Sequence, residues 1–219
     1  MVDGPIVAVR GEATHEVPAE VVRFSVTVAA RDKDRQATLA RLAERAEAVR
    51  SLIDGYGAAI ERRESTSLHV SPEIKRSGEK VVAYSGSVST TVTVADFAVL
   101  GELMLRLADQ DQTSVNGPWW ELRPGSPVHR EVRRAAIADA ISVARDYAEA
   151  LGARVVALVE VADPGMQMQP LMMARASFAE AADAGMPSID LDPQVQSVHA
   201  TIEARFRIST PTAISDPVD

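Results

Sequence analysis

The chain has 219 residues, 46% of them hydrophobic and 25% charged, and its formal net charge is −8. These proportions are typical of globular proteins and exclude global disorder. The acidic balance disfavours binding to nucleic acid, because like charges repel the phosphate backbone. The chain has no cysteine, which excludes disulfides, thiolate catalysis and cysteine-ligated zinc.

No stretch of the chain approaches ~18 uninterrupted apolar residues, so we expect no membrane-spanning helix. The N-terminal residues lack the basic segment and the long apolar segment of a signal peptide. From this we expect a cytoplasmic protein.

The N-terminal part alternates strand and helix patterns. Two strand-like runs, at 6–17 and 19–31, are expected to pair as a hairpin, and the second places one apolar set on a single face: Val22, Phe24, Val26 and Val28. From Asp34 the period changes to three and four residues, which predicts an amphipathic helix with this stripe: Leu39, Leu42, Ala43, Ala46, Val49, Ile53 and Tyr56. Asp32 or Asp34 caps its start, and Gly55 and Gly57 supply positive-φ positions at its end.

Strand patterns follow at 59–74 and 80–94, joined by Ser77-Gly78, and Asp96 is expected to cap a short helix. A further strand is predicted at 113–124. The clearest helix covers 127–151 and carries a continuous apolar stripe that Gly152 ends: Val128, Val132, Ala136, Ala140, Val143, Tyr147 and Leu151. The alanines of this stripe allow the helix to approach a sheet closely.

Two final strands are predicted at 153–163 and 196–210. The resulting order, ββαββαβαββ, indicates an α+β fold with antiparallel sheets. We expect a single domain over 1–219, with its core at about 5–210, a Met-rich insertion at about 164–193 and a frayed tail at 211–219.

This order, with particular segments at its joints, resembles the SIMPL domain family. The resemblance covers about residues 5–210 and is carried by these segments: VAVRGEA, VPAEVVRFSVTV, AIERRESTSLHVSPEI, AYSGSVSTTVTVADFAVLGEL, RRAAIADAISVARDYAEALGARVVALVEV and SVHATIEARFRI. The family includes bacterial oxidative-stress defence proteins and periplasmic immunogenic proteins, and its biochemical activity is unknown. The resemblance implies a stress-related role and homo-oligomerisation, as in some relatives.

No catalytic, cofactor-binding or metal-binding constellation is visible in the residues. The four histidines, at positions 15, 69, 129 and 199, are not spaced three or four residues apart, and no H-E-x-x-H motif occurs. No G-x-S-x-G motif and no phosphate-binding glycine loop is present. The sequence therefore predicts no catalytic residue, no metal and no cofactor.

Candidate interface residues come from two segments. Trp119 and Trp120 are adjacent on a predicted strand, so their rings point to opposite faces, one toward the core and one toward solvent or a partner. The segment PGMQMQPLMMARASF, 164–178, holds four of the seven methionines. Soft Met side chains pack adaptably, which favours a long loop with a short helix at about 171–182 that contacts another surface. Its candidate interface residues are Met166, Met168, Met172, Met173 and Phe178; copper binding by these thioethers is a weaker alternative, because M-x-x-M spacing is absent.

Two functions remain open at this stage. The first is a non-enzymatic, self-associating binding or scaffold protein with a protein partner of unknown identity. The alternative is a small-molecule-binding protein or weak enzyme with a pocket between the sheet and the 127–151 helix.

Overall fold

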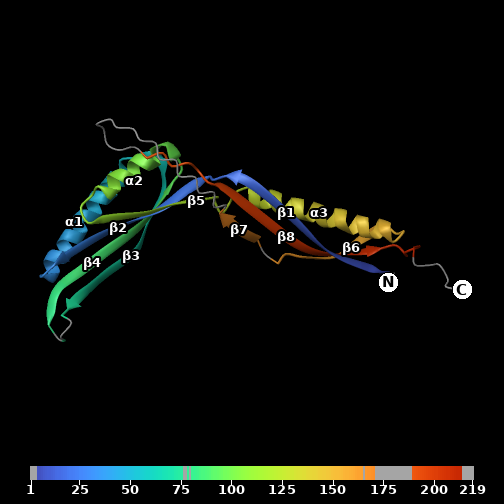
Figure 1. Ribbon diagram of the computed structural model, residues 1–219, viewed down its shortest axis with the longest axis horizontal. Helices are drawn as coiled ribbons and strands as arrows, with labels where there is room; N and C mark the ends of the chain where they lie inside the picture. Colours follow the sequence, from blue (N-terminus) through green and yellow to red (C-terminus); the bar gives the residue numbers. More distant parts are fainter. Residues whose placement is uncertain (1–3, 76–77, 79, 165, 171–188, 214–219) are drawn as a thin grey trace. The chain divides into compact units, whose positions relative to one another are not determined.

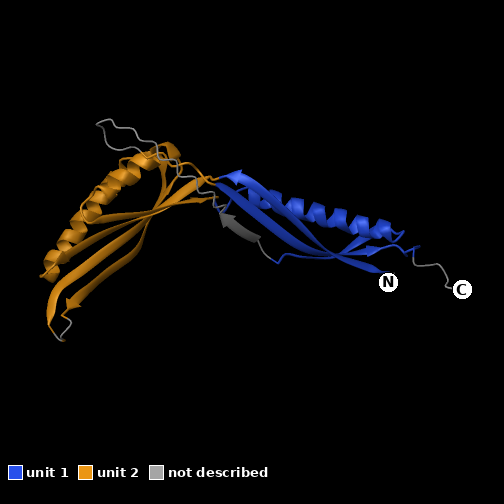
Figure 2. Cartoon of the chain, viewed as in Figure 1, with its two compact units in different colours: residues 1–18, 123–172, 195–219 blue, residues 19–122, 173–194 orange. Residues whose placement is uncertain are grey.

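The computed structural model describes residues 4–75, 78, 80–164, 166–170 and 189–213, with backbone only for 166–170. The chain forms two compact units, and each is described by itself (Figure 2). Unit 1 comprises Met1–Pro18, Arg123–Met172 and Val195–Asp219, and unit 2 comprises Ala19–Leu122 and Met173–Gln194. In each unit an antiparallel sheet carries helix on one face (Figure 1). The predicted α+β class with antiparallel sheets is confirmed.

Unit 1 is a sheet backed by one long helix. Its elements are β1 (Ile6–Pro18), α3 (Val128–Ala150), β6 (Val155–Ala162), β7 (Met166–Pro170) and β8 (Val195–Ile208). The long strand β8 lies in the middle and pairs with β1 along one edge, from Ile6 opposite Arg207 to Pro18 opposite Val195. Along its other edge, β6 and then β7 pair with successive parts of β8. Every second residue of β8 is buried, from Gln196 to Ile208.

Helix α3 packs close to β1 because both elements present small residues where they meet. A Cβ atom on Gly11 would lie 2.2 Å from the carbonyl oxygen of Ala136 and 2.6 Å from the Cβ of Ala140. Only glycine fits this position of β1. The expected close approach of an alanine-lined helix to a sheet is therefore confirmed.

The buried stripe of α3 differs from the predicted one in its second half. The buried positions continue in steps of four, ending at Ala144 and Ala148, whereas Tyr147 is exposed. A helix turn takes 3.6 residues, so a stripe in steps of four winds slowly around the helix. The buried stripe of α3 can therefore follow the twist of the strands beneath it. The prediction assumed a straight stripe and for this reason placed Tyr147 in it.

Unit 2 is a four-stranded sheet with two helices. Its elements are β2 (Val21–Asp32), α1 (Arg35–Asp54), β3 (Ile60–Ile74), β4 (Val81–Val94), α2 (Leu100–Ala108) and β5 (Thr113–Glu121), with short 3-10 turns at Gly57–Ala59 and Phe97–Val99. The strand order is β3-β4-β2-β5. The predicted apolar face of β2 lies in the centre of the core, from Val22 to Val28.

Two predictions made for this region are wrong. The runs at 6–17 and 19–31 do not form a hairpin, because β1 pairs with β8 in unit 1 and β2 pairs with β4 and β5 in unit 2. Leu39 and Ala43 of the predicted α1 stripe are exposed, and Thr38 is buried in place of Leu39. The Thr38 hydroxyl donates a hydrogen bond to the carbonyl oxygen of Asp34 at 2.9 Å. Its burial therefore leaves this hydroxyl paired.

The ends of the helices follow the predicted capping signals with one exception. Asp34 accepts a hydrogen bond from the backbone N–H of Ala37 at 2.8 Å, and Asp96 caps the turn before α2 in the same way. Gly57 and Gly152 have positive φ, at 51° and 64°. Gly55 is helical, with φ −61°, so it does not need to be glycine for its conformation.

Candidate interaction surfaces

The two tryptophans lie on opposite faces of β5, as predicted. Trp120 is 7% exposed and meets the ring of Phe97 edge to face, with 4.9 Å between ring centroids. Trp119 is 41% exposed and lies opposite Arg23 of β2. The guanidinium of Arg23 is in turn 3.2 Å from the carboxylate of Glu121. Trp120 therefore belongs to the core of unit 2, and Trp119 is the indole available to a partner.

The Met-rich segment is not a loop throughout. Met166 and Met168 lie on strand β7, opposite Ala200 and Val198 of β8. The prediction of a loop from 164 onward is therefore wrong for 166–170, where the backbone pairs with the long strand β8. The other predicted interface residues of this segment, Met172, Met173 and Phe178, lie outside the described residues.

The face of the unit 2 sheet that points away from its helices is polar. Successive outward residues of β4 are hydroxyl side chains: Ser85, Ser87, Ser89, Thr91 and Thr93. Several bond to neighbouring strands, with Thr27 and Ser89 joined at 2.8 Å and Ser71 and Ser85 at 3.4 Å. Two of the five hydroxyls, those of Ser85 and Ser89, are thus bonded to hydroxyls of neighbouring strands.

In unit 2, each pKa value that is shifted from its ordinary value moves away from neutrality. A two-pronged hydrogen bond from Arg31, with contacts of 2.9 and 3.0 Å, lowers the pKa of the Glu73 carboxyl. A hydrogen bond from the backbone of Asp34 lowers the pKa of Asp32. Burial raises the pKa of Tyr56, whose hydroxyl lies 3.0 Å from Glu102. A general acid or base needs a pKa moved toward neutrality, so none of these groups is prepared for proton transfer.

In unit 1 the outer strand β6 exposes apolar side chains on both of its faces. Val156, Leu158, Val159 and Val161 are between 44% and 59% exposed. Leu158 and Val161 lie opposite Phe206 and Ala204 of β8, whose side chains point toward α3. Helix α3 packs mainly over β1 and β8 and only slightly against β6 (Figure 1), so Leu158 and Val161 stay exposed.

Sequence reasoning did not identify β6 as a candidate surface, although the sequence contains a signal for it. The segment VVALVEVA does not alternate apolar with polar residues. Such a run is typical of a strand buried on both faces. At the edge of a sheet, the same run instead exposes apolar side chains on both faces.

The other edge of this sheet is protected. The backbone N–H of Glu12 on β1 donates to the Oδ2 atom of Asp139 on α3, at 2.9 Å. This N–H is consequently unavailable for pairing with another strand. The exposed side chains of β1 around it include Arg10, Glu12 and Glu16.

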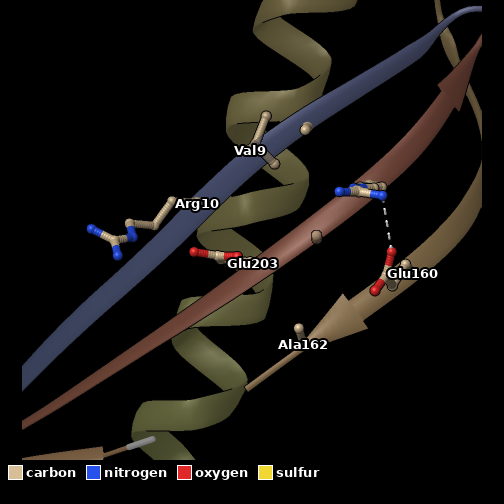
Figure 3. Close-up of a pocket in the computed structure, with 8 residues that line it drawn as sticks. Val9, Arg10, Glu160, Ala162 and Glu203 are labelled. Atoms are coloured by element: carbon tan, nitrogen blue, oxygen red, sulfur yellow. Dashed lines mark ion pairs between the residues drawn. The ribbon is translucent and has the colours of Figure 1, made fainter. Parts of the chain in front are cut away.

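The open face of the unit 1 sheet has a shallow hollow of about 270 Å³ (Figure 3). Charged residues from all three strands line it, among them Arg10, Glu160, Glu203 and Arg205. Arg205 and Glu160 form an ion pair at 3.4 Å. The hollow is on the side of the sheet opposite α3, and at Gly11 the space between sheet and helix is filled. The alternative pocket predicted between the sheet and the 127–151 helix therefore has no room at that point.

Neither metal binding nor a membrane span has support in the described part of the chain. No group of three or more His, Asp or Glu side chains gathers there in an arrangement that could hold a metal ion. His199 is bonded through both ring nitrogens to hydroxyls, those of Thr14 at 3.0 Å and Thr201 at 2.9 Å. Within the same described residues, no helix has the length and apolar character to cross a membrane.

The chain is an α+β protein built from two helix-backed antiparallel sheets. Its candidate interaction sites are the polar and apolar surfaces just described. The model of the SIMPL family, described as a protein of unknown function (DUF541), matches residues 7–206. The chain belongs to the SIMPL family, and the match runs through both units. No curated protein matches the chain.

Proposed function

We propose that this SIMPL-family chain is a non-enzymatic, self-associating module that binds or organises protein partners. The observation that carries the proposal is the exposure of apolar side chains on the outer strands of its sheets. In unit 1 these are the residues of β6, and in unit 2 they are Leu68 and Ile74 of the outer strand β3 with Val81 and Val82 beside them on β4. Apolar surface of this kind on a sheet edge favours association with another chain.

The shifted pKa values support the non-enzymatic part of the proposal. The carboxyl groups with a resolved shift are held charged, and the tyrosine with a resolved shift is held protonated at neutral pH. These shifts are opposite in direction to those that prepare a general acid or base. The family resemblance extends the proposal to a role in the stress response.

Light scattering coupled to size-exclusion chromatography tests self-association directly. Over a concentration series from about 1 to 100 µM, spanning the range of moderate affinities, we expect a mass at least twice the 23.5 kDa of one chain at the upper end. A mass of one chain at every concentration would remove the proposal.

A further inference from the structure

The two outer edges of the unit 1 sheet differ in how they are protected against pairing with another chain. An exposed strand edge pairs with other chains unless charges, bulges or a covering element protect it. On β1, Asp139 of α3 occupies the N–H of Glu12 at 2.9 Å, and charged side chains lie around this point. The β1 edge is protected by both devices.

The β6 edge lacks these two devices. Glu160 is the one charged residue between Val155 and Ala162, and Arg205 of the neighbouring strand neutralises it at 3.4 Å. Two bulges, between Val155 and Ala157 and between Leu158 and Glu160, are the one protective device on this strand besides Glu160, and they limit regular pairing to short stretches of the edge. The edge is therefore apolar and locally neutral on a chain whose formal net charge is −8.

The flank of α3 away from Asp139 also carries an exposed apolar side chain. Residues two positions apart on a helix point about 200° apart, because each residue turns the chain by about 100°. Asp139 reaches the outer edge of β1, so Ile137 lies on the opposite flank, toward β8 and β6. Ile137 is 40% exposed. It is a further exposed apolar side chain of unit 1, like those of Leu158 and Val161.

We propose that β6 pairs edge to edge with the β6 strand of a second copy of the chain, antiparallel and about a two-fold axis. This inference rests on the proposed self-association and names its surface. A head-to-tail arrangement that places β6 across the middle of β1 would require the N–H of Glu12 that Asp139 occupies. A two-fold arrangement uses one self-complementary patch on both copies and closes at two chains.

Charge also selects a second copy as the occupant. Two chains that each carry a formal charge of −8 repel over most of their surface. The β6 edge is neutral, because Arg205 compensates Glu160 within each copy. If the strands cross at Leu158, each Glu160 lies opposite Val156 of the other copy. The two carboxylates are then four residues apart along the strands, about 14 Å at a rise of about 3.4 Å per residue, which is beyond the screening length of about 8 Å in physiological salt.

The absence of cysteine makes this pairing directly testable. Three single-cysteine variants, Ala157→Cys, Leu158→Cys and Val159→Cys, place one thiol each along the edge. Ala48→Cys on α1 is the control, because this position is exposed and lies outside the apolar outer strands of both units. A disulfide needs Cα atoms within about 7 Å, so only residues near the crossing point cross-link. On mild oxidation we expect at least one β6 variant to form covalent dimer ten-fold faster than the control.

The outcomes separate this inference from the proposed function. If the unmodified chain has a two-chain mass by light scattering but the three β6 cysteines cross-link no faster than Ala48→Cys, the chain self-associates through another surface and the β6 pairing is wrong. If the unmodified chain is monomeric throughout, both proposals fall. Faster cross-linking between Val159→Cys and Ala8→Cys chains than between Val159→Cys chains alone would identify β1 as the partner edge and overturn the two-fold arrangement.

Discussion

The Asp139 carboxylate of α3 accepts a hydrogen bond from the backbone N–H of Glu12 on β1, at 2.9 Å. The two residues are 127 positions apart in the chain, and their contact ties the helix to the outer edge of the sheet. It also marks which edge of the unit 1 sheet is closed to other chains. The edge formed by β6 carries no equivalent cap among the contacts of the described residues.

The first prediction concerns this cap. Replacing Asp139 by Ala removes the acceptor, and we expect the free energy of unfolding to fall by about 1 kcal/mol, the usual net value of one hydrogen bond. We also expect the chain to form larger assemblies, because both edges of the sheet are then open. Asp139→Asn is the control, since its amide oxygen can still accept the hydrogen bond. Denaturant unfolding and light scattering measure the two effects, and equal behaviour of the two variants would contradict the role of the cap.

The second prediction concerns the packing of α3 on β1. A Cβ on Gly11 would lie 2.2 Å from the carbonyl oxygen of Ala136, so Gly11→Ala forces the helix away from the strand. Overpacking of this kind costs about 1–3 kcal/mol. Gly125→Ala is the matched control, because a Cβ there meets no atom within 4 Å and its φ is not positive. Urea unfolding should separate the two variants, and an unchanged midpoint for Gly11→Ala would refute the close approach.

The third prediction concerns the pair Arg31 and Glu73. Arg31 lowers the pKa of Glu73 chiefly through its hydrogen bonds. Because the folded pKa is below the unfolded one, the pair stabilises the fold at pH values above the unfolded pKa. This contribution is lost as the pH falls through the folded pKa.

Arg31→Gln should therefore raise the pKa of Glu73 toward its ordinary value, as followed by NMR titration. Arg62→Gln is the control, because Arg62 pairs with Glu64 at 3.1 Å and not with Glu73. The side chains are exposed, so we expect only a small change in overall stability. An unchanged Glu73 titration in Arg31→Gln would contradict the assignment.

The fourth prediction uses the two tryptophans. Trp120 is buried against Phe97 and Trp119 is 41% exposed, so acrylamide should quench the fluorescence of Trp119 preferentially. Trp119→Phe should lose most of the quenchable signal, and Trp120→Phe should keep it. If Trp119 belongs to a subunit contact, its quenching should also fall as the protein concentration rises. Concentration-independent quenching would exclude Trp119 from that contact.

Local sequence patterns predicted the helices and strands of this fold well. They did not predict which strands pair when the partners are far apart in the sequence. The period of two in β2 placed Val22 to Val28 in the core, and the cap at Asp34 placed the start of α1. The partner of β1 could not be predicted in this way. Its neighbour in space is β8, which begins at Val195, and the short link to β2 suggested a hairpin instead. No local pattern distinguishes a turn between paired strands from a connection between two sheets.

The candidate surfaces show the same limit. Adjacent positions on a strand were enough to separate the faces of Trp119 and Trp120. The apolar run of β6 predicted a strand, but its exposure depends on where α3 stops covering the sheet. That limit depends on the pairing of β1 with β8, which the sequence pattern did not reveal.

Sedimentation velocity of three proteins at one micromolar-range concentration tests the central claim most directly: the unmodified chain, Leu158→Lys and Leu68→Lys. Both replaced leucines are exposed, at 57% and 71%, so both variants should fold, and their circular dichroism should match that of the unmodified chain. Lysine on an edge strand is a common guard against pairing. We predict that Leu158→Lys sediments as one chain, while Leu68→Lys and the unmodified chain sediment as two. An assembly that survives in Leu158→Lys and is lost in Leu68→Lys would contradict pairing through β6.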